Sequence, residues 1–260
     1  MPLVSVIMPA FNAERFIQES IESALAQTLG DIELLVADDA STDRTRAIVA
    51  ELARRDSRIR LLKVERNTGP AAARNRAIEA ACGRYISFLD SDDCWLAHKL
   101  ERQIDAMRAN EWAFSFGGYE IIGSDGAIRS RVGAPEFVTY HRLLRNNVVG
   151  CLTAVYDSAI LGKVFAPSVG RSDLGLWLRV VRKAGEGRGL NEILAQRRLH
   201  SMSFSTRKRR VARQNWQIYR QEGFGLLSSL WYFGAYAATG TLKTYFPKTA
   251  SKLGVLITPP

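Results

Sequence analysis

The sequence predicts an α/β fold with a mostly parallel central sheet. Over roughly the first 110 residues, short apolar and β-branched stretches alternate with stretches that carry apolar residues at helical spacing. The chain has 260 residues, of which 47% are hydrophobic, and this is enough for the core of one large domain. The sequence shows no internal repeat and no low-complexity segment, so a repeat architecture or a disordered chain is not expected.

The first half of the chain is expected to hold four strands, each followed by a helix. The strands are predicted at residues 3–9, 32–38, 59–65 and 84–90, and the helices at residues 13–28, 41–55, 69–82 and 94–109. We expect Asn12 to cap the first helix and Ser41 or Thr42 to cap the second. This order of elements favours a sheet covered by helices on both faces.

The pattern is less regular beyond residue 110. A hairpin is predicted at residues 113–122 and 127–132, because the sequence between them, GSDG, is typical of a turn. Further elements are expected as a helix and then a strand at residues 143–157, an amphipathic helix at 174–185 and a closing strand at 193–200. We therefore divide the chain into one domain at residues 1–205 and a basic, amphipathic helical extension at residues 206–260.

The positive charge of the chain is concentrated in the predicted extension. The formal net charge is +10, and residues 206–260 contain nine Lys or Arg and a single acidic residue, Glu222. The rest of the chain is therefore nearly neutral, which does not favour a nucleic-acid-binding protein. The three cysteines, Cys82, Cys94 and Cys151, include no CxxC pair, and this favours free thiols in a reducing, cytoplasmic compartment. We expect Cys94 to be a packing residue and not a nucleophile.

The extension also combines basic and apolar segments. Residues 206–216 are basic, and the apolar stretch at 224–238 has 15 residues, fewer than the roughly 20 that span a bilayer. The N-terminus begins with a predicted strand and does not show the pattern of a signal peptide. A basic segment beside an apolar one favours contact with an anionic membrane surface. The alternative is that the extension packs on its own domain or on the partner in a homodimer.

Acidic side chains gather where two of the predicted strands end. Asp38 and Asp39 follow the second strand, and Asp90, Asp92 and Asp93 follow the fourth. Because ligands bind beyond the carboxyl ends of parallel strands, both clusters should line one crevice. A D-x-D sequence in that place suits a divalent cation, since hard cations take oxygen ligands. A solvated loop with helix-capping aspartates is the other explanation.

Arginines at residues 72–77 begin the helix between the two acidic clusters. Carboxylates and arginine around one crevice suit a metal-bound nucleotide diphosphate, because arginine binds phosphate oxygens bidentately. The sequence contains neither GxGxxG after its first strand nor GxxxxGK[ST]. A dinucleotide-dependent dehydrogenase and a P-loop NTPase are therefore disfavoured.

Four segments in this order resemble the family 2 glycosyltransferases, which have the GT-A fold. They are VSVIMPAFNAERFIQESIESALAQT, IELLVADDASTDRT, NTGPAAARN and GRYISFLDSDDCW, and weaker likeness continues in SDLGLWLRVVRKAG and QRRLHSMSFS. The resemblance covers about 200 residues and does not extend to the basic segment that follows. It implies that residues 1–110 bind a nucleotide-sugar and that residues 111–205 bind the acceptor.

The resemblance implies a role for each residue that matches a family motif. The implied nucleotide-sugar-binding residues are Pro9 and Phe11 at the base, Asp38 and Asp39 at the uracil or thymine edge, Arg74 at the diphosphate, and Asp90 and His200 near the metal. Asp90 and Asp92 match the D-x-D motif that binds Mg²⁺ or Mn²⁺, with Asp92 as the more direct ligand. For His200, a capping or surface role is the alternative.

The family's catalytic base lies in a Glu-Asp pair before an aromatic helix. In this chain Ser172 replaces the first acid and Asp173 remains, so the resemblance implies that Asp173 is the base. The alternative is that Asp173 only caps the helix at 174–185. We expect Trp177 to face the core. Ala40 stands where the family often has glycine, which predicts a turn without positive φ.

These features together predict an inverting, metal-dependent glycosyltransferase. It would move a sugar from a UDP- or TDP-type donor to a glycan or a lipid-linked acceptor in the biosynthesis of a cell-surface polysaccharide, at the inner face of a membrane. Two alternatives stay open. One is a sugar nucleotidyltransferase, although PAFNAE lacks the glycine-rich basic loop expected there. The other is an inactive nucleotide-sugar-binding protein associated with the membrane.

Overall fold

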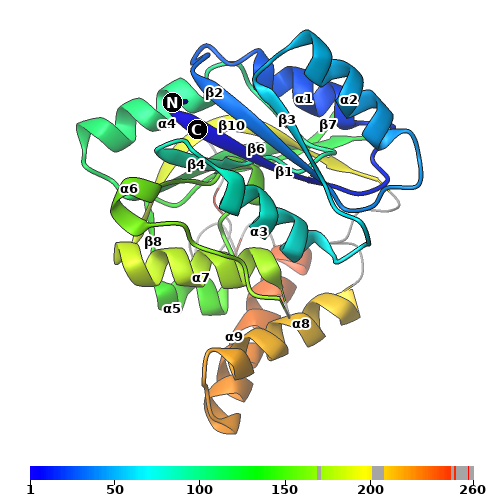
Figure 1. The fold of residues 1–260 in the computed structure, drawn as a ribbon. Coiled ribbons are helices and arrows are strands. Elements are labelled where there is room, and N and C mark those ends of the chain that lie inside the picture. The colour runs from blue at the N-terminus through cyan, green and yellow to red at the C-terminus, as the bar shows by residue number, and fades with distance from the viewer. Residues whose placement is uncertain (169–170, 201–207, 247–248, 250–256, 258–260) are drawn as a thin grey trace.

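The central element of the computed structural model is a ten-stranded sheet with helices on both faces (Figure 1). The structure describes residues 1–168, 171–200, 208–246, 249 and 257. The strands are β1 (Val4–Ala10), β2 (Ile32–Asp38), β3 (Ile59–Lys63), β4 (Tyr85–Phe88), β5 (Cys94–Trp95), β6 (Phe114–Gly123), β7 (Ile128–Val132), β8 (Phe137–Val138), β9 (Val155–Asp157) and β10 (Gly187–Leu199). The helices are α1 (Ile17–Leu25), α2 (Thr45–Arg55), α3 (Pro70–Ala80), α4 (Lys99–Ala109), α5 (Tyr140–Arg145), α6 (Ser158–Leu161), α7 (Ser172–Ala184), α8 (Lys208–Gln221) and α9 (Leu226–Tyr245), with a 3₁₀ turn, η1, at Cys151–Thr153.

The sheet is parallel in its first half and mixed in its second. The strand order is β3-β2-β1-β4-β9-β6-β10-β5, with β7 beside β6 and β8 beside β10. Strands β3, β2, β1 and β4 are all parallel to one another. Strand β9 is antiparallel to both β4 and β6, and β10 is parallel to β6. The predicted α/β fold is confirmed, and the parallel order holds for the four strands that the sequence pattern identified.

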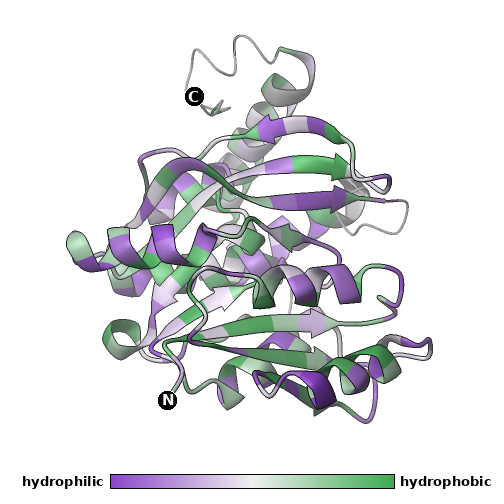
Figure 2. Ribbon diagram, turned by 90° about the horizontal axis from the view of Figure 1, so that it is seen from above, coloured by the Kyte–Doolittle hydropathy of each residue, from purple (hydrophilic) through white to green (hydrophobic). Residues whose placement is uncertain are grey.

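Two hydrophobic layers hold the helices against the sheet. Side chains of a strand alternate between its faces, so Val6 and Met8 of β1 enter one layer and Ile7 enters the other. The first layer contains buried residues of α1 and α4, and the second contains buried residues of α3 and α7. Trp177 is fully buried in the second layer and stacks on Phe114, which confirms that it faces the core. In Figure 2 the strands nearest the N-terminus are largely hydrophobic, whereas the outer helices carry both colours.

Several predicted boundaries and caps were wrong. Helix α1 begins at Ile17 after Phe16, and Asn12 does not cap it. Instead, Oδ1 of Asn12 accepts from the backbone N–H of Thr42 at 2.9 Å, and Ser41 accepts from the backbone N–H of Asn12 at 3.0 Å. These side chains therefore join the β1–α1 loop to the β2–α2 loop, because each reaches an unpaired N–H of the other loop.

The region predicted as one helix at residues 94–109 has two parts. Cys94 and Trp95 form the short strand β5, which pairs with β10, and α4 begins only at Lys99. Backbone groups of β5 form hydrogen bonds with β10. The local sequence pattern does not reveal this pairing, because β10 lies about a hundred residues further along the chain. Cys94 is a free, buried thiol, as expected of a packing residue. The hairpin β6–β7 and the helix α7, which ends at Gly185 with φ of 82°, agree with the prediction.

The extension forms a helical hairpin on the domain. The hydroxyl of Tyr219 in α8 donates to the carbonyl of Leu144 in α5 at 2.8 Å, and the hydroxyl of Tyr140 donates to Glu222 at 2.6 Å. The alternative that the extension packs on its own domain is therefore confirmed for α8 and α9. No helix in the described part of the chain is long and apolar enough to cross a membrane. The boundary at residue 205 falls outside the described residues, as do residues 206 and 207 of the predicted basic segment, and that boundary stays a prediction.

The turn after β2 contains a strained residue. Ala40 has φ of 58°, so the prediction that alanine there excludes positive φ was wrong. In this region the Cβ of an L-residue approaches the following carbonyl, at a cost of about 1–2 kcal/mol. The turn accepts the strain because the backbone N–H of Asp39 is held by the carbonyl of Ala10 at 2.9 Å and Ser41 is held by Asn12. The geometry of this turn comes from the contacts between loops and not from the local residue.

Ala40→Gly is therefore expected to keep the free energy of unfolding or to raise it by up to about 1 kcal/mol, since glycine has no Cβ to clash. Ala50→Gly, in the middle of α2, is the matched control and should lower it by about 1 kcal/mol. Urea denaturation measures both variants. Equal destabilisation by the two substitutions would show that the φ of Ala40 carries no strain.

Glu33 links three segments at the opposite end of β2. It is buried and accepts from the hydroxyl of Ser5 at 2.7 Å, the backbone N–H of Cys82 at 2.6 Å and the guanidinium of Arg60 at 2.7 Å. Burial alone raises the pKa of Glu33, but these hydrogen bonds outweigh it, so the pKa lies below its ordinary value. The charged form is thus the one that the fold stabilises.

Glu33→Gln is expected to lower the free energy of unfolding by about 1–3 kcal/mol at neutral pH. Because the folded-state pKa is lowered, the contribution of Glu33 is present above about pH 4.3, the ordinary glutamate value, and is lost as the pH falls through the folded-state pKa. The gap between variant and wild type should therefore narrow in acid. Denaturation at neutral and at acid pH measures the difference in free energy of unfolding between the variant and wild type. Glu51→Gln, on the exposed face of α2, is the control. An unchanged gap in acid would contradict the role of the charge.

Candidate active site

The carboxyl ends of β1, β2 and β4 bring the predicted site residues to one edge of the sheet. Strand β1 lies between the other two, with Ala10 beside Asp38 of β2 and Ile7 beside Phe88 of β4. The acidic residues that follow β2 and β4 therefore leave the sheet at the same edge, separated by the width of one strand. The expectation that both clusters meet at one place is confirmed. This placement follows from parallel pairing alone.

Asp38 and Asp39 are both buried and both already have partners. Oδ2 of Asp38 accepts from Nε of Arg46 at 2.7 Å, and its Oδ1 has no hydrogen-bond partner among the described residues. Asp39 accepts from the backbone N–H and hydroxyl of Thr68, each at 2.9 Å, and from the backbone N–H of Gly69 at 2.7 Å. Asp39 thus fixes the loop before α3. Neither carboxylate is exposed in this structure, and their contact with a base stays a prediction.

Pro9 and Phe11 flank the end of β1. Pro9 is buried within the strand, and 48% of Phe11 is exposed directly after it. A large aromatic side chain exposed at a strand end is available for stacking on a planar ligand. The two residues therefore lie at the edge where the resemblance implies a base, although no ligand contact is described.

Arg74 joins the two sides of the site. It is buried in α3, and one Nη donates to Oδ1 of Asp90 at 3.0 Å while the other donates to the hydroxyl of Ser172 at 3.4 Å. Asp90 follows β4, whereas Ser172 begins α7. The Nε of Arg74 is buried without a hydrogen-bond partner among the described residues. Arg74 thus has donor capacity left for a ligand with oxygen acceptors, as expected for a residue that meets a diphosphate.

Asp92 and His200 meet although 108 residues separate them. Nε2 of His200 lies 2.9 Å from Oδ2 of Asp92, at the end of β10. His200 also lies against the ring of Phe16, with centroids 5.2 Å apart. The expectation that His200 lies near the D-x-D motif is therefore confirmed by geometry, and a role in binding stays a prediction. The neighbouring residue Ser201 lies outside the described residues.

Arg198 holds the acidic loop in place from β10. Its backbone N–H donates to Oδ1 of Asp93 at 2.8 Å, and its Nε donates to the carbonyl of Asp92 at 3.1 Å. A third bond, from Nη2 to Glu19 at 2.7 Å, reaches α1. Burial, together with the charges of Asp92 and Asp90, raises the pKa of Asp93 well above its ordinary value. Asp93 therefore stabilises the loop from its buried side, whereas Asp90 and Asp92 remain partly exposed.

The donor set around Asp92 fits Mg²⁺ or Mn²⁺ only together with a substrate. Among the described residues no group of three or more His, Cys, Asp or Glu could hold a metal ion alone. Asp92 and His200 are two adjacent donors, and Asp90 is close in the sequence but engaged by Arg74. Mg²⁺ commonly binds through one or two carboxylates, waters and substrate phosphates, and not in a complete protein cage. The residues present therefore fit a cation that arrives with a diphosphate.

Although 36% of the Asp90 side chain is exposed, burial of the rest raises its pKa. The positive charge of Arg74 opposes this effect and the negative charge of Asp92 adds to it. The direction follows from placing two carboxylates two residues apart where water has limited access. The repulsion between them is the electrostatic property that a bound cation would relieve.

Asp173 lies in the first turn of α7, and two side chains hold its oxygens. Nε of Arg171 donates to its Oδ1 at 3.2 Å, and Nδ2 of Asn147 donates to its Oδ2 at 3.3 Å. The N-cap position of α7 is Arg171, so Asp173 is not the N-cap residue of the helix. Burial raises the pKa of Asp173, but the charges of Arg171 and Arg74 and a hydrogen bond from the backbone of Leu174 outweigh this, and the pKa is lowered. Asp173 is thus ionised and able to accept a proton at neutral pH.

Several residues of the site were not found from the sequence. Arg46, Thr68, Arg171, Asn147 and Arg198 all position a predicted carboxylate. Arg171 is the one with a visible signal, since it stands two residues before Asp173. The others contact their partners only because the fold brings separate segments together, and the spacing of residues in the sequence does not reveal these contacts.

The chain matches known proteins along nearly all of its length. The model of the family described as "Glycosyl transferase family 2" matches residues 5–160. The "Putative teichuronic acid biosynthesis glycosyltransferase TuaG" of Bacillus subtilis (strain 168) is 40% identical over 245 residues, which cover 93% of this chain and 97% of TuaG. The "UDP-Glc:alpha-D-GlcNAc-diphosphoundecaprenol beta-1,3-glucosyltransferase WfgD" of Escherichia coli is 41% identical over 245 residues, which cover 94% of this chain and 96% of WfgD.

Solved structures share the fold at low identity. S. aureus TarS 1–349, in complex with UDP-GlcNAc, has a TM-score of 0.68 and 19% identity and covers 99% of this chain and 77% of that chain. The mannosyltransferase PcManGT from Pyrobaculum calidifontis, in complex with GDP-Man and Mn²⁺, has a TM-score of 0.67 and 18% identity and covers 97% of this chain and 79% of that chain. Both likenesses concern the arrangement of the helices and strands, which is the GT-A fold. With the family model and the two bacterial relatives, they establish that this chain is a glycosyltransferase and belongs to glycosyl transferase family 2.

Proposed function

We propose that the chain transfers a sugar from a UDP- or TDP-type donor to a lipid-linked or glycan acceptor, with inversion and with the help of Mg²⁺ or Mn²⁺. The observation that carries the proposal is the arrangement around Arg74. This arginine bonds to Asp90 of the D-x-D motif on one side and to Ser172, beside Asp173, on the other. A donor diphosphate at Arg74 would therefore lie between the residues that hold a metal and the carboxylate that accepts a proton.

The donor side is formed by β1, β2 and the start of α3. Phe11 and Pro9 are proposed to flank the base, and Asp38 is the better candidate for its polar edge, because one of its oxygens has no partner among the described residues. Asp39, whose oxygens are all used by Thr68 and Gly69, is proposed to shape the pocket through that loop. TarS was solved with UDP-GlcNAc, which supports a nucleotide-sugar donor here.

Asp92, His200 and Asp90 are the residues proposed to hold the metal. When bound, a divalent cation supplies positive charge for the leaving diphosphate. PcManGT was solved with Mn²⁺, which supports a metal in this fold without fixing the ion. Arg74 adds a second, permanent positive charge from the protein, since arginine does not lose its proton at neutral pH.

Asp173 is proposed as the general base of a single displacement. It takes the proton of the acceptor hydroxyl as the hydroxyl oxygen bonds to the anomeric carbon, and the bond from that carbon to the diphosphate oxygen breaks with its electron pair. One displacement inverts the anomeric centre. A carboxylate with a lowered pKa is a weak base, so its effect depends on the position that Arg171 and Asn147 impose on it.

Two relatives support a lipid-linked acceptor. WfgD and WfaP of Escherichia coli both carry names that specify a GlcNAc-diphosphoundecaprenol acceptor and UDP-Glc as the donor, and WfaP is 33% identical over 246 residues. TuaG carries a name from teichuronic acid biosynthesis. We therefore propose that the reaction belongs to the assembly of a surface polysaccharide and takes place at the cytoplasmic face of a membrane. The family assignment favours this transferase over a sugar nucleotidyltransferase and over an inactive binding protein.

A thermal-shift screen of nucleotide-sugars with and without Mn²⁺ tests the donor and the metal together. A UDP- or TDP-sugar is expected to raise the melting temperature more with Mn²⁺ than without it, because binding to the folded state stabilises it. Asp92→Ala should abolish the part that depends on Mn²⁺. Asp105→Ala, an exposed aspartate on α4, is the control and should keep it. A full Mn²⁺-dependent shift in Asp92→Ala would contradict the ligand assignment.

Asp173→Asn should retain the donor-induced thermal shift and lose transfer by about 10²–10⁴-fold in kcat, since the amide cannot accept the proton. Release of the nucleoside diphosphate in the presence of a GlcNAc-diphospholipid acceptor measures the rate. Asp105→Asn serves as the control. Turnover at the wild-type rate by Asp173→Asn would eliminate this residue as the base, whereas loss of donor binding would assign it to the donor site instead.

A further inference from the structure

The hairpin of α8 and α9 is bonded to the domain at several points, and the start of α9 projects from it (Figure 1). Nδ1 of His141 lies 2.8 Å from the hydroxyl of Tyr232 in the second turn of α9, and further along α9 Thr239 donates to the carbonyl of Arg145 at 3.1 Å. At the turn, Glu222 accepts from Arg182 of α7 and from Tyr140 of α5. The hairpin therefore cannot swing freely, and its direction is set by α5 and α7.

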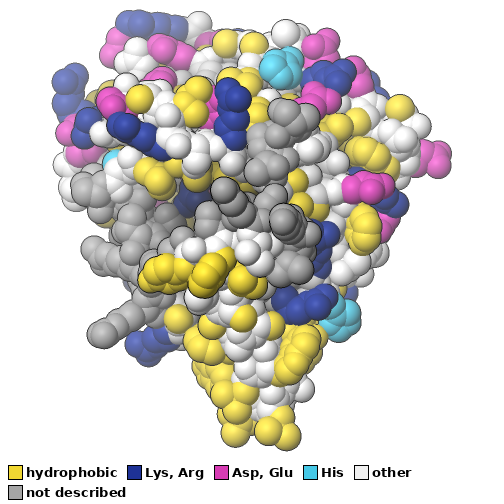
Figure 3. Space-filling view, turned by 180° about the vertical axis from the view of Figure 1, so that it is seen from behind, with side chains coloured by type: hydrophobic (Ala, Val, Ile, Leu, Met, Phe, Trp, Pro, Cys, Tyr) yellow, Lys and Arg dark blue, Asp and Glu magenta, His cyan; other side chains and the backbone are white. Residues whose placement is uncertain are grey.

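The free end of the hairpin is apolar. Leu226, Leu227, Leu230 and Trp231 are all more than half exposed, and Leu227 is 83% exposed. We call these four residues the hairpin tip. Their spacing puts them on one side of the first turns of α9, whereas Ser229 and Tyr232 on the other side are buried. Figure 3 shows hydrophobic side chains covering the lower, narrow end of the molecule. An apolar cluster so exposed is a contact surface and not a core.

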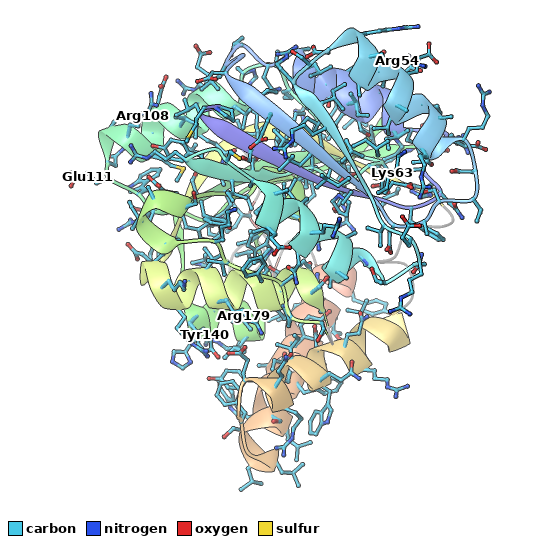
Figure 4. All side chains as sticks on the ribbon, viewed as in Figure 1. Arg54, Lys63, Arg108, Glu111, Tyr140 and Arg179 are labelled. Carbon is cyan, nitrogen blue, oxygen red and sulfur yellow. The ribbon has the colours of Figure 1, made fainter. Side chains whose placement is uncertain are left out.

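Basic side chains lie on the domain beside the hairpin. Arg220 lies in the last turn of α8, and an open depression on the neighbouring side of the domain is lined by Lys163, Phe165, Arg179, Arg182 and Lys183. Figure 4 shows the labelled Arg179 and Tyr140 on the side of the domain from which the hairpin projects. The single acidic residue of the described part of the extension, Glu222, is largely buried and paired with Arg182. An apolar tip that projects beyond basic side chains of the domain matches the layers of an anionic bilayer.

A second copy of the chain is a poorer fit for the hairpin tip. A stable dimer interface buries about 800 Å² on each partner, and four side chains at the end of a narrow projection do not offer that area. A twofold contact through the tip would also bring Arg220 of both copies to one interface, because the same surface is used on each copy. Like charges brought together in this way oppose association.

We propose that the hairpin tip inserts among the lipid headgroups of an anionic membrane and fixes the direction in which the active site faces it. The inference rests on the proposed use of a lipid-linked acceptor. Helix α7 carries Asp173 in its first turn and Arg182 in its last, and Arg182 bonds to Glu222 at the turn of the hairpin. The rigid helix α7 thus connects Asp173, the proposed general base, to the hairpin that carries the proposed membrane contact. The contact is made by residues 226–231, which lie within the apolar stretch at 224–238 that the sequence analysis paired with the basic segment at 206–216.

Flotation of the full chain with vesicles tests the proposal. Wild type should bind vesicles of equal parts phosphatidylcholine and phosphatidylglycerol, bind phosphatidylcholine alone weakly, and lose binding in high salt. Leu227→Gln with Leu230→Gln should lower the partition coefficient at least about tenfold, because two apolar anchors are lost. Ile128→Gln with Ile160→Gln is the matched control, since both isoleucines are about half exposed elsewhere on the surface, and it should bind as wild type does.

Three outcomes would overturn the proposal. The first is equal flotation of the tip variant and wild type, and the second is equal loss in the control pair. The third is a wild-type dimer that becomes monomeric in the tip variant without vesicles, as measured by sedimentation, which would assign the tip to a second copy. Circular dichroism checks that both variants are folded.

The proposed function is tested separately with a short-chain, water-soluble acceptor. The tip variant should transfer to it at the wild-type rate while losing transfer to acceptor in vesicles. Absence of transfer by wild type to either acceptor would refute the proposed function and leave the vesicle result standing.

Discussion

Repulsion between carboxylates at one edge of the sheet is the constraint around which the site is organised. Strand β2 ends at Asp38, the aspartates of the D-x-D motif follow β4, and β1 is the strand that separates β2 from β4. Three side chains from other elements bond to these carboxylates: Arg46 from α2, Arg74 from α3 and His200 directly after β10. Each buried carboxylate has a partner, as it must if it is to stay charged away from water. Asp90 and Asp92 remain partly exposed and can face a ligand.

The second half of the chain contributes the residues that complete the candidate site. Strand β10 carries Arg198 and His200 to the acidic loop, and α7 carries Asp173 to Arg74. The side chain of Asn75, adjacent to Arg74, accepts from the backbone N–H of Ala166 at 2.7 Å and donates to its carbonyl at 2.9 Å. This pair ties α3 to the segment that leads to α7. The first and second halves of the domain are thus joined by specific bonds beside the candidate site.

Much of the fold could be predicted because periodicity is a local property of the chain. The four parallel strands and their helices, the β6–β7 hairpin and α7 all show in the spacing of apolar residues. The exceptions depend on contacts between distant segments. Asn12 and Ser41 have the chemistry of caps but serve the opposite loop, and Ala40 accepts positive φ because its neighbours hold the turn. The same division applies to the site: the carboxylates are visible in the sequence, whereas Arg46 and Asn147 become visible only when the chain is folded.

The position of Arg74 has a consequence for the order of events. Its positive charge is one of those that lower the pKa of Asp173, and it also stabilises Asp90. An anion that engages Arg74 partly neutralises that charge, so Asp173 then holds a proton more strongly than before. Asp173, the proposed general base, would therefore be a weaker base while the proposed diphosphate site at Arg74 is empty and a stronger one when that site is occupied. Binding of the nucleotide-sugar would then make Asp173 a better acceptor for the proton of the acceptor hydroxyl. This coupling would act through the guanidinium of Arg74, without any movement of the backbone.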